Sequence, residues 1–272
     1  MFKDFKGAAK RIDDIDLPKL AYTIGVGEDE LHAVIDTETS GSGFDRAGRP
    51  KMLFEPHVFY RNLDGAERDE AVAEGLAYKA WGTLKYPADS YPRLEKAMQI
   101  NETAALRSAS WGLGQILGEN HAAAGYGTPQ EMVLAFLDDE EDHLAAMVDF
   151  IVTAGLDDDL RALAMLDRPT QPSDCVPFVR VYNGAGYARN NYHVKMATHH
   201  NRWRGIPDTP WLPEMELMPR KLRDTSLQQE LKKLGLYQMR VDGIWGPKSE
   251  AALEEYRTAE RRINDLLSVE VI

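Results

Sequence analysis

The first forty residues contain an apolar stripe that ends in an acid. Leu31, Val34, Ile35 and Glu38 follow one another at intervals of three and four residues, the spacing that places side chains on one face of a helix. The segment Ser40–Gly43 comes directly afterwards and is predicted to end this helix. Glu38 is therefore expected at a helix end, half-buried, where burial disfavours the charged carboxylate and raises its pKa. Such a carboxyl group can act as a general acid near neutral pH; the alternative is a surface glutamate in a frayed last turn.

A second acid, Glu55, follows further along the chain. The stretch before it is predicted to form two short extended arms around a turn at residues 47–50, and this turn contains a glycine. The second arm, Met52–Phe54, leads to Glu55, and Pro56 suits the first turn of another helix. This helix and hairpin are expected to bring Glu55 back toward Glu38. Two carboxyl groups are what glycoside hydrolysis uses. The alternative is that Glu55 caps the helix that begins at Pro56.

Three segments carry a resemblance to a known family. They read ETSGSGF from Glu38, GRPKMLFEPHVFY from Gly48 and SASWGLGQILGENHAAAGY from Ser108. Over roughly residues 29–203 the chain resembles the phage-type N-acetylmuramidases, a branch of the lysozyme-like enzymes. Within that resemblance, Ser110–Ile116 is similar to a signature of goose-type lysozymes and soluble lytic transglycosylases, and Val181–Gly184 is similar to a second segment of the same enzymes.

The resemblance implies a catalytic site. In the family, the glutamate that corresponds to Glu38 is the catalytic acid, and the one that corresponds to Glu55 lies close to the site. The other two segments are expected to line a sugar cleft, because aromatic faces pack on sugar rings while amides and hydroxyls bond their polar groups. For Trp111 alone we favour ordinary core packing, whereas the glycine-rich turn after Tyr182 and Asn183 favours the site. The candidate substrate-binding residues are Ser110, Trp111, Gln115, Tyr182 and Asn183.

A proline-rich stretch divides the chain. Three prolines within residues 207–213 exclude a helix interior. The predicted organisation is a catalytic domain over residues 1–204, a linker over 205–218 and a second module over 219–272. The predicted fold class is mainly α, with an α+β lysozyme-like domain that carries a small β-hairpin, followed by a small helical domain. A chain of 272 residues with 43% hydrophobic composition is long enough for both.

The second module follows a recognisable pattern. Leu227–Leu253 resembles the small helical peptidoglycan-binding domain, with two helices separated by a tight turn at residues 241–247. In this cell-wall-binding module Asp242 is expected to be a structural turn residue. Trp245 either contributes to a groove for glycan or stem peptide or fills the small core. A first helix would have to come from Met215–Arg223.

Composition excludes several classes of protein. No apolar run is long enough to span a membrane. The first 19 residues lack the apolar core of a secretory signal, which predicts accumulation in the host cytoplasm until a separate membrane-permeabilising protein allows release. The net charge of −12 disfavours nucleic acid as a partner. A single cysteine, Cys175, excludes an intramolecular disulfide and suits a reducing folding environment.

Neither a metal nor a cofactor is expected. The acidic runs Leu137–Asp142 and Leu156–Asp159 are interpreted as solvated helix faces and termini, because the glycine and terminal glutamate of a calcium loop are missing. The histidines at 143, 193, 199 and 200 form no zinc motif.

The predicted function is that of an endolysin, a glycoside hydrolase that acts as a monomer on peptidoglycan glycan strands without stable membrane association. Glu38 would protonate the β-1,4 glycosidic oxygen between N-acetylmuramic acid and N-acetylglucosamine, with Glu55 or a nearby aspartate activating water. The nearest alternative is a lytic transglycosylase, in which the muramyl 6-hydroxyl attacks instead of water. Another is a non-catalytic wall-binding protein. A cysteine peptidase built on Cys175 and His193 is disfavoured, so Cys175→Ser is expected to be silent.

Overall fold

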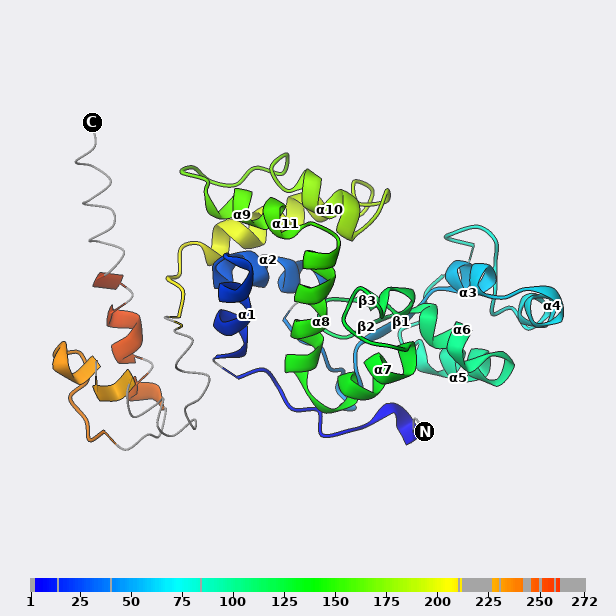
Figure 1. Cartoon of the computed structure of the whole chain (residues 1–272), viewed down its shortest axis with the longest axis horizontal. Helices are drawn as coiled ribbons and strands as arrows, with labels where there is room; N and C mark the ends of the chain where they lie inside the picture. Colours follow the sequence, from blue (N-terminus) through cyan, green and yellow to red (C-terminus); the bar gives the residue numbers. More distant parts are fainter. Residues whose placement is uncertain are drawn as a thin grey trace.

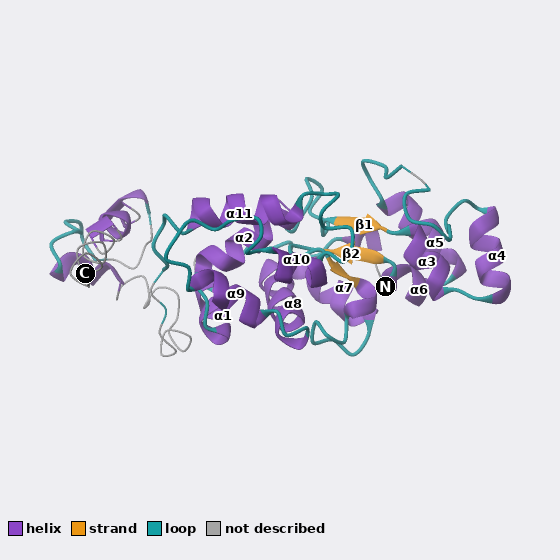
Figure 2. Ribbon diagram, turned by 90° about the horizontal axis from the view of Figure 1, so that it is seen from above, coloured by secondary structure: helices purple, strands orange, loops and turns teal. Residues whose placement is uncertain are grey.

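The computed structural model of this chain is mainly helical, with one three-stranded antiparallel sheet in its described residues (Figure 1). Figure 2 shows the strands together among the helices of the larger part of the molecule, which the described residues between 3 and 209 form. The predicted mainly α fold class is confirmed. The structure describes residues 3–13, 15–39, 41–83, 85–209, 211, 227–229, 231–241, 246–249, 251–256 and 258–259.

Most helices in the larger part of the molecule begin at recognisable sequence signals. Proline occupies the first turn of α3, α5, α7 and α10, where its fixed φ and missing N–H cost nothing. Thr128 and Glu131 form a capping box at the start of α7. In chain order the elements are η1 (Lys3–Phe5), α1 (Asp16–Ile24), α2 (Glu28–Thr39), β1 (Met52–Phe54), α3 (Pro56–Asn62), α4 (Gly65–Ala73), α5 (Tyr91–Ile100), α6 (Glu102–Arg107), β2 (Ala109–Trp111), β3 (Ile116–Leu117), η2 (Gly118–Asn120), α7 (Pro129–Asp138), α8 (Glu140–Thr153), α9 (Asp157–Ala164), α10 (Val176–Tyr182) and α11 (Tyr192–Trp203).

Two apolar clusters form the core, and α8 contributes to both. One cluster contains Phe54, Trp111 and Phe136 together with Ala146 of α8. The other contains the buried face of α2 and residues of α1, α9, α10 and α11, together with Met147 of α8. In Figure 1, α8 stands between the helices around α2 and the sheet. Because α8 serves both clusters, it fixes the two halves of the larger part relative to each other.

Helix α2 has the predicted stripe. Leu31, Val34 and Ile35 are almost completely buried, and Glu38 occupies the next position of the same face, partly exposed. The helix ends at Thr39, and Gly41 has a φ of 82°, a conformation that glycine adopts without steric cost. The predicted position of Glu38 at a helix end is confirmed.

The predicted hairpin is only partly correct. Phe44 and Pro50 form a single antiparallel bridge around the turn. The second arm, β1, instead pairs with β2, with Met52 opposite Trp111 and Phe54 opposite Ala109. Local turn signals cannot reveal this partner, because β2 lies more than fifty residues further along the chain. Strand β3 pairs with the other edge of β2.

The C-terminal part contains a small apolar cluster of its own, formed by Leu231, Tyr237, Ala252 and Leu253. Residues 227–229, 231–233, 247–249 and 251–256 are helical, as the pattern predicts. In these helices Leu234 and Ala251 are exposed, whereas Ala252 is buried. The expected helix over residues 215–223, together with Asp242 and Trp245, lies outside the described residues.

The predicted linker begins attached to the larger part. Asp208 accepts a hydrogen bond from the backbone N–H of Glu28 at 2.9 Å, and the N–H of Thr209 donates to the Glu28 carboxylate. These residues therefore dock on the start of α2. In the part of the chain that the structure describes, no helix is sufficiently long and apolar to cross a membrane.

Candidate active site

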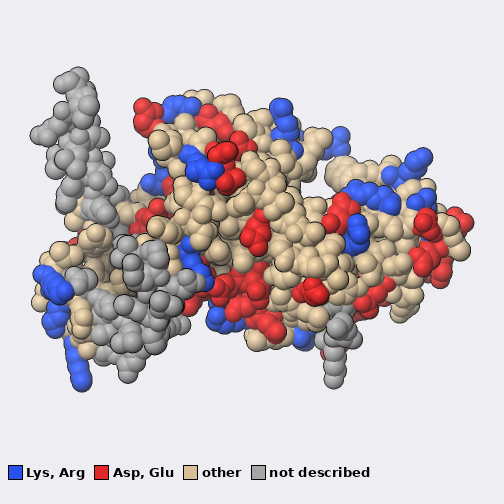
Figure 3. Space-filling view, in the orientation of Figure 1, with Lys and Arg blue, Asp and Glu red and all other residues tan. Residues whose placement is uncertain are grey.

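Two groups of helices enclose a cleft that has the sheet at its floor. The helices α3 to α6 lie on one side, and α10 with the start of α11 lies on the other. The cleft has a volume of about 1260 Å³, and Figure 3 shows the molecule hollowed between these groups. Glu38 and Gln115 also line a smaller adjoining cavity of about 340 Å³. A cleft larger than the usual pocket for a small molecule suits an extended ligand.

Glu38 lies in this cleft at the end of α2. Its Oε1 accepts a hydrogen bond of 2.7 Å from Nδ2 of Asn183, the residue directly after α10. Burial raises the pKa of Glu38 to about 7, and the Asn183 hydrogen bond and the charge of Lys195 oppose this rise only in part. The carboxyl group is thus available in its protonated form near neutral pH.

The Asn183 amide also determines which oxygen of Glu38 can release a proton. Since Nδ2 is a donor, Oε1 of Glu38 is held as the acceptor, and the proton of the neutral acid belongs on Oε2. The amide oxygen of Asn183 is itself buried and has no hydrogen-bond partner among the described residues. It can accept from a polar group of a ligand in the cleft.

Glu55 lies at the N-cap position of α3, but its side chain makes no capping hydrogen bond. Its Oε2 accepts from the hydroxyl of Tyr86 at 2.5 Å and lies 3.3 Å from Nδ1 of His57. All three residues line the cleft. The capping interpretation is therefore wrong for the side chain, and the structure gives both acids access to the same cleft. Glu38 and Glu55 are the two carboxyl groups among its described lining residues.

Comparison with known proteins gives the family of the chain. The model of the N-acetylmuramidase family matches residues 28–204, the segment that builds the cleft. The chain belongs to the N-acetylmuramidase family. A crystal structure of an endolysin from Burkholderia phage AP3 is similar, with a TM-score of 0.60 and 32% identity over 72% of this chain and 73% of that one. No curated protein matches the chain. The protein is an endolysin-type muramidase, a glycosidase that acts on peptidoglycan.

The predicted substrate-binding residues of the muramidase divide into two groups. Ser110, Gln115, Tyr182 and Asn183 line the cleft. Trp111 is fully buried in the core and donates from its indole N–H to the carbonyl of Leu106. The core packing favoured for Trp111 is thus confirmed, and its place among the candidate substrate-binding residues is wrong, because the pleat of β2 turns Trp111 inward and its neighbour Ser110 toward the cleft.

The side chains of Tyr182 and Gln115 support the cleft of the muramidase by donating hydrogen bonds to backbone carbonyls. The hydroxyl of Tyr182 donates to the carbonyl of Gly114 at 2.7 Å, and burial holds its pKa well above the ordinary value. Gln115 has a φ of 48°, and its Nε2 donates to the carbonyls of Gly112 and Lys51. Both side chains thus fix the loop between β2 and β3.

Sequence reasoning missed several residues that line the muramidase cleft. Trp81 and Tyr86 come from the loop between α4 and α5, and Arg189 comes from the loop before α11. The guanidinium of Arg189 lies 5.3 Å from the ring centroid of Trp81, so these loops meet across the cleft. Aromatic residues in a loop that also contains glycine and proline were the available signal. Tyr192 and Lys195, at the start of α11, also line the cleft.

A cluster of titratable groups lies at the opposite end of α2. Glu30 and His200 are buried, and Nε2 of His200 lies 2.8 Å from Oε1 of Glu30 and 3.7 Å from Oδ2 of Asp29. Nδ1 of His200 bonds the hydroxyl of Thr170. Ligand atoms of the two acids and the histidine lie within 4.8 Å of one another, a proximity that their sequence spacing does not reveal. Hydrogen bonds within the protein already engage both ring nitrogens, and the cluster ties α2 to α11.

Proposed function

We propose that this muramidase hydrolyses the β-1,4 bond between N-acetylmuramic acid and N-acetylglucosamine, with Glu38 as the general acid. The observation that carries the proposal is a carboxyl group with a pKa of about 7, held by Asn183 inside a cleft large enough for a glycan. Such an acid is half protonated near neutral pH. It can give its proton to the glycosidic oxygen as the bond breaks.

Glu55 is the proposed partner of Glu38. As the other carboxyl group on the described cleft wall, it can activate water or stabilise the positive charge that develops on the sugar ring. The Tyr86 hydroxyl donates to one oxygen of Glu55, which fixes the orientation of the carboxyl group. This arrangement favours hydrolysis over transglycosylation, since the latter needs one acid and no activated water.

The products of digestion test the proposal. Purified peptidoglycan is digested, and the new ends of the soluble fragments are identified by mass spectrometry. Reducing N-acetylmuramic acid ends are expected. Fragments lighter by one water, with anhydro-muramyl ends, would instead identify a lytic transglycosylase. An absence of fragments, with the protein retained on the pellet, would identify a wall-binding protein without activity.

Variants test the individual roles. Glu38→Gln retains the size and the hydrogen bond of the side chain, and it is expected to lower the rate by roughly 10²- to 10⁴-fold. Glu55→Gln is expected to lower hydrolysis as well, because an amide is neither a base nor an anion. A folded Glu38→Gln protein with near-normal activity would contradict the assignment of the acid.

We also propose that residues 219–272 bind peptidoglycan. The support is the motif over Leu227–Leu253 and the apolar cluster that its described residues form. In a sedimentation assay with insoluble peptidoglycan, Trp245→Ala is expected to weaken binding. The matched control is Met239→Ala, which replaces an exposed apolar side chain of the same module. Equal binding by both variants would contradict a role for Trp245.

The similarity to a phage endolysin supports host-cell lysis as the biological role. Expression in a susceptible bacterium is expected to cause lysis when a membrane-permeabilising protein is expressed with it. The Glu38→Gln variant is the control and is expected not to lyse the cells.

A further inference from the structure

Glu140 is a buried carboxylate outside the cleft. Glu140, in the acidic run interpreted above as solvated, is fully buried at the first position of α8, so that interpretation is wrong for this residue. Its Oε1 accepts from the backbone N–H of Gly43 at 2.7 Å, and its Oε2 accepts from the N–H of Ile12 at 3.2 Å. A buried charge is costly unless it is paired and hydrogen-bonded, so this site has a specific complement of donors.

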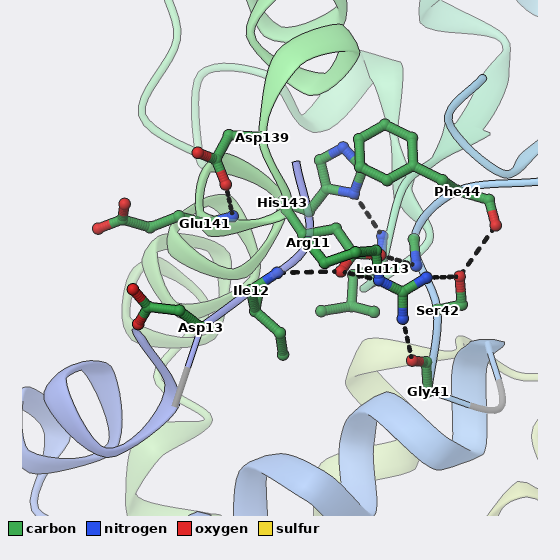
Figure 4. Close-up of polar contacts among 12 residues, drawn as sticks. Arg11, Ile12, Asp13, Gly41, Ser42, Phe44, Leu113, Asp139, Glu141 and His143 are labelled. Atoms are coloured by element: carbon green, nitrogen blue, oxygen red, sulfur yellow. Dashed lines mark hydrogen bonds and ion pairs between the residues drawn. The ribbon is translucent and has the colours of Figure 1, made fainter. Parts of the chain in front are cut away.

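Arg11 supplies the charge that pairs with Glu140. Its Nε lies 2.8 Å from Oε2 of Glu140. The two Nη atoms of the same guanidinium donate to Oγ of Ser42 at 2.7 Å and to the carbonyl of Gly41 at 3.2 Å. Figure 4 shows Arg11 reaching Ser42 and Gly41, with His143 and Leu113 nearby. Arg11 and Glu140 therefore hold three consecutive residues of one loop, Gly41–Gly43.

This loop connects the end of α2 to the floor of the cleft. Gly43 accepts from the backbone N–H of Lys51 at 2.6 Å, and Nζ of Lys51 donates to the carbonyl of Thr39, the last residue of α2. The carbonyl of Lys51 in turn accepts from Nε2 of Gln115. A displacement of the loop would therefore reach both the helix end that carries Glu38 and the cleft residue Gln115.

The loop is also packed tightly against α8. A Cβ atom on Gly43 would lie 2.3 Å from Nδ1 of His143, and the same nitrogen accepts from the N–H of Leu113 at 3.2 Å. His143 lies one turn after Glu140, so α8 contacts the loop after α2 and the loop after β2 together. This leaves little room for the loop to shift while Glu140 and Arg11 stay in place.

We propose that Arg11 and Glu140 are positioning residues of the muramidase, which fix the loop Gly41–Gly43 and thereby the placement of Glu38 in the cleft. The inference rests on the proposed role of Glu38 as the acid. Arg11 lies before residue 28, where the match to the family model begins. The segment of residues 3–13 thus takes part in organising the active site.

The test compares substitutions at two neighbouring positions. Arg11→Met removes the hydrogen-bond donors and the positive charge but keeps the aliphatic length, whereas Arg11→Lys keeps a positive charge. The matched control is Lys10→Met: Lys10 pairs with Asp139, next to Glu140, through a salt bridge of 2.9 Å. Among the described residues, the side chain of Lys10 bonds Asp139 and none of residues 41–43, and it is as exposed as that of Arg11. Initial rates on soluble peptidoglycan fragments give kcat and KM for each variant.

Arg11→Met is expected to lower kcat roughly tenfold to a hundredfold, since a misplaced catalytic group has effects of this size. KM should change less, because the loop continues directly from the end of α2 that carries Glu38, whereas it reaches the cleft residue Gln115 only through Lys51. The alkaline limb of the kcat profile should also move, as the surroundings of Glu38 change. The titratable groups whose charges interact with Glu38 are Lys195, Tyr182 and Tyr192, and every variant retains them. Arg11→Lys should recover part of kcat, and Lys10→Met should match the wild type.

Wild-type kcat and pH profile in Arg11→Met would overturn the proposal. So would a loss shared equally by Lys10→Met, or a fall in Tm without a change in kcat or in the pH profile. Glu140→Gln retains the acceptor for Gly43 and loses the charge opposite Arg11, so it should change kcat in the same direction. If Glu38→Gln is active, the role of Glu38 itself fails. If Glu38→Gln is inactive and Arg11→Met is normal, only the positioning role fails.

Discussion

Replacing Glu38 by glutamine is expected to make the protein more stable at alkaline pH, although it removes the proposed acid. Glutamine has nearly the same size and retains an oxygen that accepts from Nδ2 of Asn183. The principal change is the loss of a group that ionises inside the cleft. The effect on stability therefore measures what it costs to keep a charge at this position.

The magnitude follows from the pKa of Glu38, which burial raises from an ordinary value of 4.5 to about 7. A raised pKa means that the folded state binds the proton more tightly than the unfolded state. The stabilisation is complete below pH 4.5 and is lost as the pH rises toward and through 7. At about 1.4 kcal/mol per pH unit the whole loss is roughly 3 kcal/mol. Since water can enter the cleft, we expect roughly 2 kcal/mol between pH 5 and pH 8.

Urea unfolding of wild type and Glu38→Gln, followed by circular dichroism at pH 5 and pH 8, measures this difference. The free energy of unfolding of the variant should gain roughly 2 kcal/mol relative to wild type between the two pH values. A matched control, Glu95→Gln, replaces an exposed glutamate of α5 and should alter stability equally at both. If the gain of Glu38→Gln is the same at pH 5 and pH 8, the argument from burial is refuted.

Three further predictions follow from the same contacts. The kcat/KM of the wild type should fall about tenfold per pH unit above pH 7, where Glu38 loses its proton. Asn183→Ala should shift this fall to higher pH, because the hydrogen bond from Asn183 lowers the pKa of Glu38. An unshifted limb would contradict that role for Asn183. Tyr86→Phe removes the donor to Glu55 and should lower hydrolysis by roughly tenfold, whereas an unchanged rate would show that Glu55 needs no such orientation. Cys175→Ser should leave kcat unchanged but destabilise the fold by about 1–3 kcal/mol in urea unfolding, because Cys175 is fully buried; in stability, the substitution is thus not silent.

The features that the sequence identified correctly depend on neighbours within a few residues. The stripe of Leu31, Val34 and Ile35 predicts helix α2 and its buried face, and the glycines after it predict where the helix ends and where Glu38 lies. Proline at the start of α3 and the two helices of the C-terminal module follow in the same way. Helical periodicity and the signals that end a helix depend only on residues close in the sequence, so they can be recognised without knowing the fold.

The features that only the tertiary structure decided depend on contacts between distant segments. Strand β1 pairs with β2 rather than with the arm before it, which turns Trp111 into the core and Ser110 toward the cleft. The hydrogen bond from Asn183 to Glu38 joins residues 145 positions apart, and the bond from Gly43 to Glu140 spans 97. Burial raises the pKa of Glu38 to about 7, whereas Glu140 is buried in an ion pair with Arg11. A sequence pattern identifies a candidate carboxyl group, but its hydrogen-bond donors and its burial are set only when the chain has folded.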